Sequence, residues 1–282
     1  MSAFDTVIIV DWSGGNQGSV KPKADAIWAC VARDGAVAPP VYLRHRQAAE
    51  SWLAETLTAE QAAGRRVLAG FDFPFGYPEG FATALTGRAD PFALWDWFEA
   101  RVMDSPTGNN RFELAGEINA RFGGRGPFWG NAGPRDVDGL PRTKKEYANR
   151  FPERRKAETQ ARGAFTLWQL AGAGAVGSQT IMGLPVLNRL RKRFGGAVAV
   201  WPFEPLAPPV SLVEVWPSLM VGPAPDGWIK DQWQVHEVAR ILAGLPVEDM
   251  ATMLDVSAPE EGWIFGLGHE AALTARGAHH AQ

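Results

Sequence analysis

The chain has 282 residues, 46% of them apolar and 21% charged, so it can bury a large hydrophobic core. Its formal net charge of −3 excludes a protein whose whole surface binds a nucleic-acid backbone, although a local basic patch remains compatible with it. A single cysteine, Cys30, excludes a disulfide framework and a cysteine-rich zinc site. We find neither a secretory signal pattern nor an uninterrupted apolar run of 18 residues, so we expect a cytoplasmic protein without membrane contact.

The first quarter of the chain is predicted to form strands and one helix. Apolar and β-branched runs predict strands over residues 6–12, 25–33 and 41–44. Helical spacing of apolar residues predicts a helix over residues 47–63, and a further strand ends near Asp72. The order is therefore three strands, a helix and a strand, which differs from strictly alternating strands and helices.

The middle of the chain has a different pattern. Residues 76–197 carry helix-like stretches and loops rich in glycine and proline, but few strand signals. The helix-like stretches cover residues 92–103, 111–122 and 162–170, while strands are predicted again over 198–204 and 212–217 and a helix over 231–242. We expect a core formed by residues 1–75 and 198–282, with residues 76–197 as a mainly helical insertion that covers the site.

Two of the predicted strands end in an aspartate that is followed at once by a turn. These residues are Asp11, after Val7-Ile8-Ile9-Val10, and Asp72, after Val67-Leu68-Ala69-Gly70-Phe71. An apolar run buries its strand, so an Asp at the strand end is carried to the edge of the sheet, where ligands bind. Two such carboxylates on neighbouring strands predict a site for a divalent cation.

The chain resembles a family of uncharacterised proteins regarded as predicted nucleases of the ribonuclease H-like fold. The resemblance spans most of the chain and is carried by Val10-Asp11-Trp12-Ser13-Gly14, Gly70-Phe71-Asp72-Phe73-Pro74-Phe75-Gly76, Val213-Glu214-Val215-Trp216-Pro217, and Lys230-Asp231 with His236-Glu237. It implies an α/β fold with a mixed five-stranded sheet, flanking helices and a large insertion. The opening order of three strands, a helix and a strand agrees with that fold.

The resemblance also implies a set of metal ligands. Asp11 would bridge two cations, and Asp72 and Glu214 would hold one each. The family usually has a second Asp, followed by Ala, in the last helix; Glu237 stands there instead, so either Asp231 or Glu237 is the fourth ligand. All five carboxylates are candidate catalytic residues, and the expected cofactor is Mg²⁺ or Mn²⁺.

Such a site predicts metal-dependent hydrolysis of a phosphodiester or phosphoester, with a nucleic acid or a nucleotide-like phosphorylated compound as substrate. Candidate substrate contacts near the carboxylates are Ser13, Gly14 and Lys230. A second group, Arg142 and Arg155, belongs to the basic segment 142–164 and would hold flanking phosphates. A solvated helix with paired charges is the alternative interpretation of this segment. The oligomeric state is left open.

Three alternative functions remain. Gly172-Ala173-Gly174-Ala175-Val176-Gly177 is a G-x-G-x-x-G pattern, although the residues before it favour a helix and Gly183-Leu184-Pro185 should break the helix that must follow. If these glycines instead form a loop near the site, Gln169, Ser178 and Gln179 become substrate contacts. Asp11 with its following glycines also resembles the first phosphate loop of actin-like and sugar-kinase-like phosphotransferases. The third alternative is a nucleotide-binding protein without catalysis.

Overall fold

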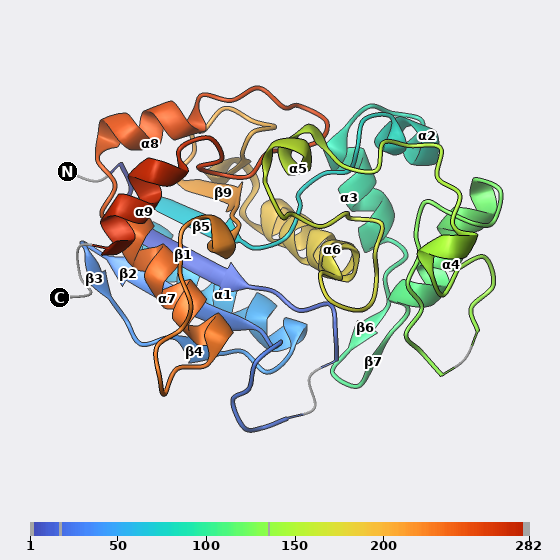
Figure 1. The fold of residues 1–282 in the computed structure, drawn as a ribbon. Helices are drawn as coiled ribbons and strands as arrows, with labels where there is room; N and C mark the ends of the chain where they lie inside the picture. Colours follow the sequence, from blue (N-terminus) through green and yellow to red (C-terminus); the bar gives the residue numbers. More distant parts are fainter. Residues whose placement is uncertain (1–2, 17–18, 135, 279–282) are drawn as a thin grey trace.

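The structure is a computed structural model that describes residues 3–16, 19–134 and 136–278. Its centre is a seven-stranded sheet in the order β3-β2-β1-β5-β9-β8, with β4 also paired to β2 (Figure 1). The strands are β1 (Thr6–Asp11), β2 (Trp28–Arg33), β3 (Ala36–Val37), β4 (Val41–Tyr42), β5 (Val67–Phe71), β8 (Val198–Val200) and β9 (Val210–Glu214). The predicted sheet had five strands; the short β3 and β4 both pair along β2.

Four of these strands, β1, β5, β9 and β8, run parallel, and β2 runs antiparallel to β1. β3 and β4 in turn pair antiparallel with β2. The chain is therefore a mixed α/β protein with a mostly parallel central sheet and flanking helices, as the sequence predicts at this level. Because β1, β5 and β9 are parallel, their carboxyl ends lie at one edge of the sheet.

Helices cover both faces of the sheet. Figure 1 shows α7 (Lys230–Ala243) across one face of β1 and β2, and α1 (Arg46–Ala62) behind the other. Successive residues of β1 alternate between these layers, as strand geometry requires. Val7 and Ile9 pack in the apolar cluster that contains α7, whereas Ile8 and Val10 pack in the cluster that contains α1. The face on which a strand-end side chain lies thus follows from its place in this alternation.

The remaining elements surround this core. They are α2 (Phe81–Thr86), α3 (Pro91–Glu99), β6 (Asp104–Ser105), β7 (Gly108–Asn109), α4 (Arg111–Arg121), α5 (Lys156–Gln160), α6 (Val176–Phe194), α8 (Val247–Leu254) and α9 (Glu270–Ala278), with 3-10 turns at Lys144–Glu146, Gly195–Ala197 and Pro217–Leu219. Aromatic residues between positions 76 and 197, among them Tyr77 and Trp168, join the same apolar cluster as Val10 of β1. None of the helices in the described ranges is long and apolar enough to cross a membrane.

Two local predictions in this segment are wrong. Residues 162–170 form turns and a single bridge between Gln169 and Trp129 instead of a helix. The helix α6 continues through Pro185, although proline removes one helical hydrogen bond. Tertiary packing explains the second error. The ring of Phe73 lies so close to Gly183 that a Cβ there would meet it at 2.3 Å, and this contact holds α6 against the turn that follows Asp72.

Candidate functional site

Asp11 and Asp72 lie level with each other on the two central strands. Val10 of β1 pairs with Phe71 of β5, so the next residue on each strand, Asp11 and Asp72, stand side by side at the carboxyl edge. The backbone N–H of Asp72 donates to the carbonyl of Val10 at 3.3 Å, and that of Trp12 donates to Oδ1 of Asp72 at 2.5 Å. Alternation along β1 places Asp11 on the face covered by α7. The structure therefore brings together the two residues that the sequence singled out.

Asp231 reaches the same place from the first turn of α7. Its side chain is buried, and its Oδ2 accepts a hydrogen bond from the backbone N–H of Asp25 at 2.6 Å. Asp25 adopts a left-handed conformation, with φ of 54°, in the loop between β1 and β2. The negative charge of Asp231 raises the pKa of both Asp11 and Asp72, so its carboxylate lies within electrostatic range of theirs. The neighbouring, exposed Lys230 acts in the opposite direction on these groups.

Burial is the main reason why these acids have abnormal pKa values. It raises the pKa of Asp11 far above its ordinary value, and the charges of Asp72 and Asp231 add to this effect. Burial also raises the pKa of Asp72, to about 8, against the opposing hydrogen bond from Trp12. The pKa of Asp231 is raised by burial as well. Without a cation, such a group of carboxylates retains protons near neutral pH.

Two carboxylates, Asp11 and Asp72, are the groups here that could share a hard divalent cation with water ligands. Among the residues that the structure describes, no group of three or more His, Cys, Asp and Glu side chains is arranged so that it could hold a metal ion. Mg²⁺ does not need such a group, because it keeps several waters and binds through one or two carboxylates together with substrate phosphates. Asp11 and Asp72 supply two carboxylates on neighbouring strands, which fits this requirement. Asp231 would contact the waters around the cation.

Glu214 does not belong to this site. It pairs with Phe71, one residue before Asp72, and alternation therefore places it on the opposite face of the sheet. Its carboxylate accepts hydrogen bonds from Nη1 and Nη2 of Arg155, at 2.8 and 2.5 Å, and from the backbone N–H of Phe75. The assignment of Glu214 as a metal ligand and catalytic residue is corrected on this geometry. Its carboxylate is committed to a buried ion pair.

The basic segment also differs from its predicted role. Arg155 is completely buried and is bound by Glu158 and Glu214, so its guanidinium is not accessible to a substrate. Arg142 is exposed but forms an ion pair with Asp136 at 2.7 Å. The charges of both arginines are therefore already paired with carboxylates.

Glu237 lies on α7 but away from Asp231. Its carboxylate is bound by Arg240 and by Nδ1 of His236. Six residues along a helix correspond to about 240° of rotation, so Asp231 and Glu237 occupy different faces of α7. Of the two alternatives for the fourth carboxylate, Asp231 is the one that lies beside Asp11 and Asp72.

The loop after β1 packs against the start of α6. A Cβ at Gly14 would lie 2.6 Å from the carbonyl carbon and Cβ of Ser178, so only glycine fits there. Gln179 donates a hydrogen bond from Nε2 to the carbonyl of Trp12 at 2.6 Å. Both contacts hold the backbone that follows Asp11. Ser13 also has a structural contact, since its Oγ accepts a hydrogen bond from the backbone N–H of Gly15.

The glycine-rich stretch 172–177 lacks the context of a dinucleotide-binding motif. The described residues immediately before it form no strand, and α6 begins only at Val176. Gln169 uses its Nε2 to donate to the carbonyls of Ala171 and Ala173, and so stabilises this loop itself. The stretch serves here as the turn that positions the start of α6.

Two surface pockets lie along α4 rather than at the carboxylates. One has a volume of about 560 Å³ and is lined by residues that include Glu113, Glu117 and Asp138. The other, of about 480 Å³, lies between α4 and the β6-β7 hairpin. Asp11, Asp72 and Asp231 line neither of them.

Three residues near the site were not singled out by their sequence pattern. Asp25 follows a polar loop, and Arg46 and Arg111 each begin a helix outside any motif. Arg46 nevertheless holds the loop after Asp11 through the carbonyls of Ser13 and Gly15. Local sequence patterns do not predict such contacts between segments that are distant in the chain.

Comparison of the chain with protein-family models, with curated proteins and with solved structures finds no match.

Proposed function

We propose that this chain is a metal-dependent phosphoester hydrolase whose cation is held by Asp11 and Asp72. The observation that carries the proposal is the position of these two carboxylates, level on adjacent parallel strands, on one face and at the carboxyl edge of the sheet. Asp231 adds a third carboxylate from the helix that covers this face. Buried acids that repel one another are costly unless a proton or a cation compensates their charge.

We further propose that the core is ribonuclease H-like. The supporting observations are the antiparallel strands β1 to β4 at the start of the chain, the helix α1, and the return to β1 through the parallel strand β5. In the resembling family, the strand ends that correspond to Asp11 and Asp72 carry metal ligands.

Bound Mg²⁺ or Mn²⁺ would supply Lewis-acid activation of a water molecule and of the phosphoryl group. Asp11 and Asp72 would fix the position of that cation at the sheet edge. Asp231, whose Oδ2 is held by the N–H of Asp25, would orient water next to it. Lys230 is exposed at the start of α7, and its ammonium would contact a substrate phosphate.

Substitution of the two aspartates tests this function. The purified protein is assayed with Mg²⁺ and with Mn²⁺ on phosphomonoesters, phosphodiesters, DNA, RNA and hybrid duplexes. Asp11→Asn and Asp72→Asn should each lower kcat/KM by at least about 100-fold, because each removes a ligand charge while preserving shape. Asp136→Asn is the matched control, since its carboxylate is 90% exposed and pairs with Arg142.

Two results of these assays would show that the proposed function is wrong. If the wild-type protein hydrolyses none of these substrates with either cation, or if both Asp→Asn variants retain full activity, the proposed function is wrong. Stabilisation by MgATP together with phosphate transfer to an acceptor would instead support the phosphotransferase alternative.

A further inference from the structure

Arg111 is a largely buried cation without a carboxylate partner. It is the first residue of α4, and its Nε donates to Oγ of Ser178 at 3.0 Å while its Nη1 donates to Oδ1 of Asn109 at 2.8 Å. The guanidinium also lies over the ring of Phe112, 4.2 Å from its centre. All these partners are neutral. Within the described part of the chain, Arg111 forms no ion pair.

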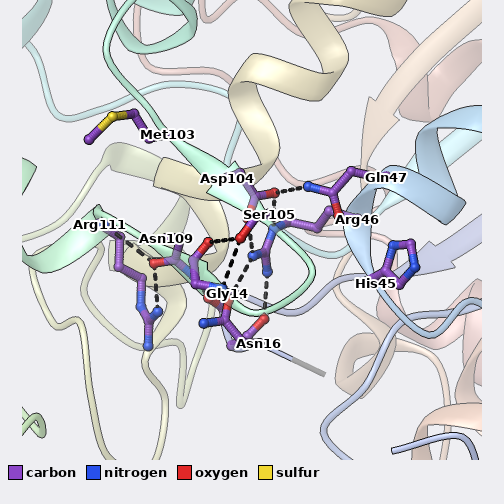
Figure 2. Close-up of polar contacts among 12 residues, drawn as sticks. Gly14, Asn16, His45, Arg46, Gln47, Met103, Asp104, Ser105, Asn109 and Arg111 are labelled. Atoms are coloured by element: carbon purple, nitrogen blue, oxygen red, sulfur yellow. Dashed lines mark hydrogen bonds and ion pairs between the residues drawn. The ribbon is translucent and has the colours of Figure 1, made fainter. Parts of the chain in front are cut away.

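Arg46, its neighbour, is different. Figure 2 shows Arg46 and Arg111 on either side of Asn109. Arg46 is bound by Asp104 through Nε and Nη2, at 2.7 and 2.5 Å, and its Nη1 donates to the carbonyls of Ser13 and Gly15. Asp104 is therefore fully engaged by Arg46. Two arginines lie close together here, and only one of them has a counter-charge in contact.

The electrostatic surroundings of Arg111 are unfavourable for a cation. Burial, followed by the positive charge of Arg46, lowers the pKa of Arg111 to about 10, against longer-range attraction by Glu113 and Asp104. A cation in the first turn of a helix is also opposed by the helix macrodipole. The unfavourable effects on the guanidinium are thus its burial, the positive charge of Arg46 and the helix macrodipole. An anion in contact with the guanidinium would compensate them.

Arg111 borders the loop that leaves the carboxylate pair. Ser178, which accepts its Nε–H, is in van der Waals contact with Gly14, three residues beyond Asp11. Asn109 donates from Nδ2 to Oδ1 of Asn16 in the same loop at 2.7 Å. Three residues of chain span at most about 10 Å, so Gly14 lies within that distance of Asp11, and a substrate extended along this loop can approach Arg111.

We propose that Arg111 binds a second phosphate group of the substrate, beside the phosphate that is cleaved at Asp11 and Asp72. Its Nη2 makes no hydrogen bond within the described residues, and a guanidinium edge matches phosphate oxygens. The substrate would then carry at least two phosphates, as a nucleic-acid backbone or a nucleoside polyphosphate does. The assignment of the ligand as a substrate rests on the proposed function, whereas anion binding by Arg111 does not.

Pyrophosphate is the probe for anion binding. Its affinity for the full-length protein is measured by calorimetry in EDTA, so that no divalent cation takes part. We expect Arg111→Gln to weaken pyrophosphate binding by about 10- to 100-fold, the value of one or two charge-assisted hydrogen bonds. The control is Arg121→Gln on the same helix, whose exposed guanidinium lies over Trp97, and it should leave the affinity unchanged.

A second variant controls for the possibility that Arg111→Gln misfolds. Arg111→Lys keeps the charge but loses the planar edge, and should show an intermediate loss. Equal pyrophosphate affinity in the wild type, Arg111→Gln and Arg121→Gln would overturn the proposal. So would binding that Arg121→Gln weakens as much as Arg111→Gln does.

The source of the second phosphate is tested separately, with Mg²⁺ present. If the substrate is a nucleic acid, the slope of log K against log salt for a single-stranded oligonucleotide should be smaller by about one in Arg111→Gln. If it is a nucleoside polyphosphate, only that ligand should lose affinity in the variant. The two proposals can also fail separately. If pyrophosphate binding depends on Arg111 but the protein hydrolyses no phosphoester, the anion site is supported and the proposed function is wrong.

Discussion

The backbone N–H of Trp12 donates to Oδ1 of Asp72 at 2.5 Å, so the first residue after β1 holds the side chain of the first residue after β5. This bond ties the two strand ends together beside Asp11. It orients Asp72 toward its neighbour, although the charges of these acids repel each other. The arrangement stores unfavourable electrostatic energy that a cation would relieve.

The first prediction concerns pH and metal. The pKa of Asp72 in the folded protein, about 8, exceeds its unfolded value near 3.9, so the folded state binds more protons between these values. Stability in EDTA should therefore fall as the pH rises from about 4 to 8. Saturating Mg²⁺ should raise Tm more at pH 8.5 than at pH 5.5, since binding displaces protons.

Asp72→Asn is the control for this experiment, because it removes the titrating charge and one ligand. Thermal melts at both pH values should show a smaller loss of stability with rising pH and a smaller Mg²⁺ shift in the variant. Equal Mg²⁺ shifts at the two pH values in the wild type would contradict the prediction.

A second prediction concerns acid stability at the opposite end of the sheet. Glu60 of α1 is completely buried and accepts hydrogen bonds from Thr6, Arg33 and Arg65. Burial acts to raise the pKa of Glu60, but these bonds outweigh it and lower the pKa to about 2. Its contribution to stability is complete above its unfolded pKa, near 4.3, and is lost as the pH falls toward 2.

Glu60→Gln should therefore lower the free energy of unfolding at pH 7 by about 2–4 kcal/mol and reduce the loss of stability between pH 4.5 and 2. Urea melts at several pH values provide the measurement. Parallel stability curves for the variant and the wild type across this range would show that Glu60 plays no such part.

The third prediction separates Glu214 from the metal site. Glu214→Gln leaves Arg155 with one fewer buried counter-charge and should destabilise the protein by about 3–5 kcal/mol. The Mg²⁺-induced rise in Tm should persist, because Asp11 and Asp72 lie on the other face of the sheet. Loss of that rise in a variant that remains folded would restore Glu214 as a ligand.

The fourth prediction concerns the close contact after β1. Gly14→Ala would place a Cβ 2.6 Å from backbone and side-chain carbons of Ser178, so the loop must move. We expect a cost of about 1–3 kcal/mol in stability and at least a tenfold loss of kcat/KM. Gly222→Ala is the matched control, because no atom lies within 4 Å of a Cβ there. Comparable activities of the two variants would argue against a role for this contact.

The sequence reveals Asp11 and Asp72 because both follow buried, β-branched runs and precede turns, a local pattern that fixes where a strand ends. It does not reveal on which face of the sheet the side chain of Glu214 lies, because a register shift of one residue exchanges the two faces. The register is fixed by the pairing of β5 with β9, which are far apart in the chain. The partner of Glu214, Arg155, is 59 residues away.

Helix α6 illustrates a second limit. Local rules predict a break at Gly183 and Pro185, and the helix continues because both residues are buried in the packed core. The glycine there admits the ring of Phe73. Arg111 is similar, because its unpaired charge appears only once the partners of Arg46 are known.

A crystal structure with Mn²⁺, using anomalous scattering to locate the ion, tests whether Asp11 and Asp72 hold a cation. We expect a peak about 2.0–2.3 Å from carboxylate oxygens of both residues, with Asp231 facing the coordinated waters. Absence of a peak there at saturating Mn²⁺, or a peak confined to the acidic pocket along α4, would contradict this expectation.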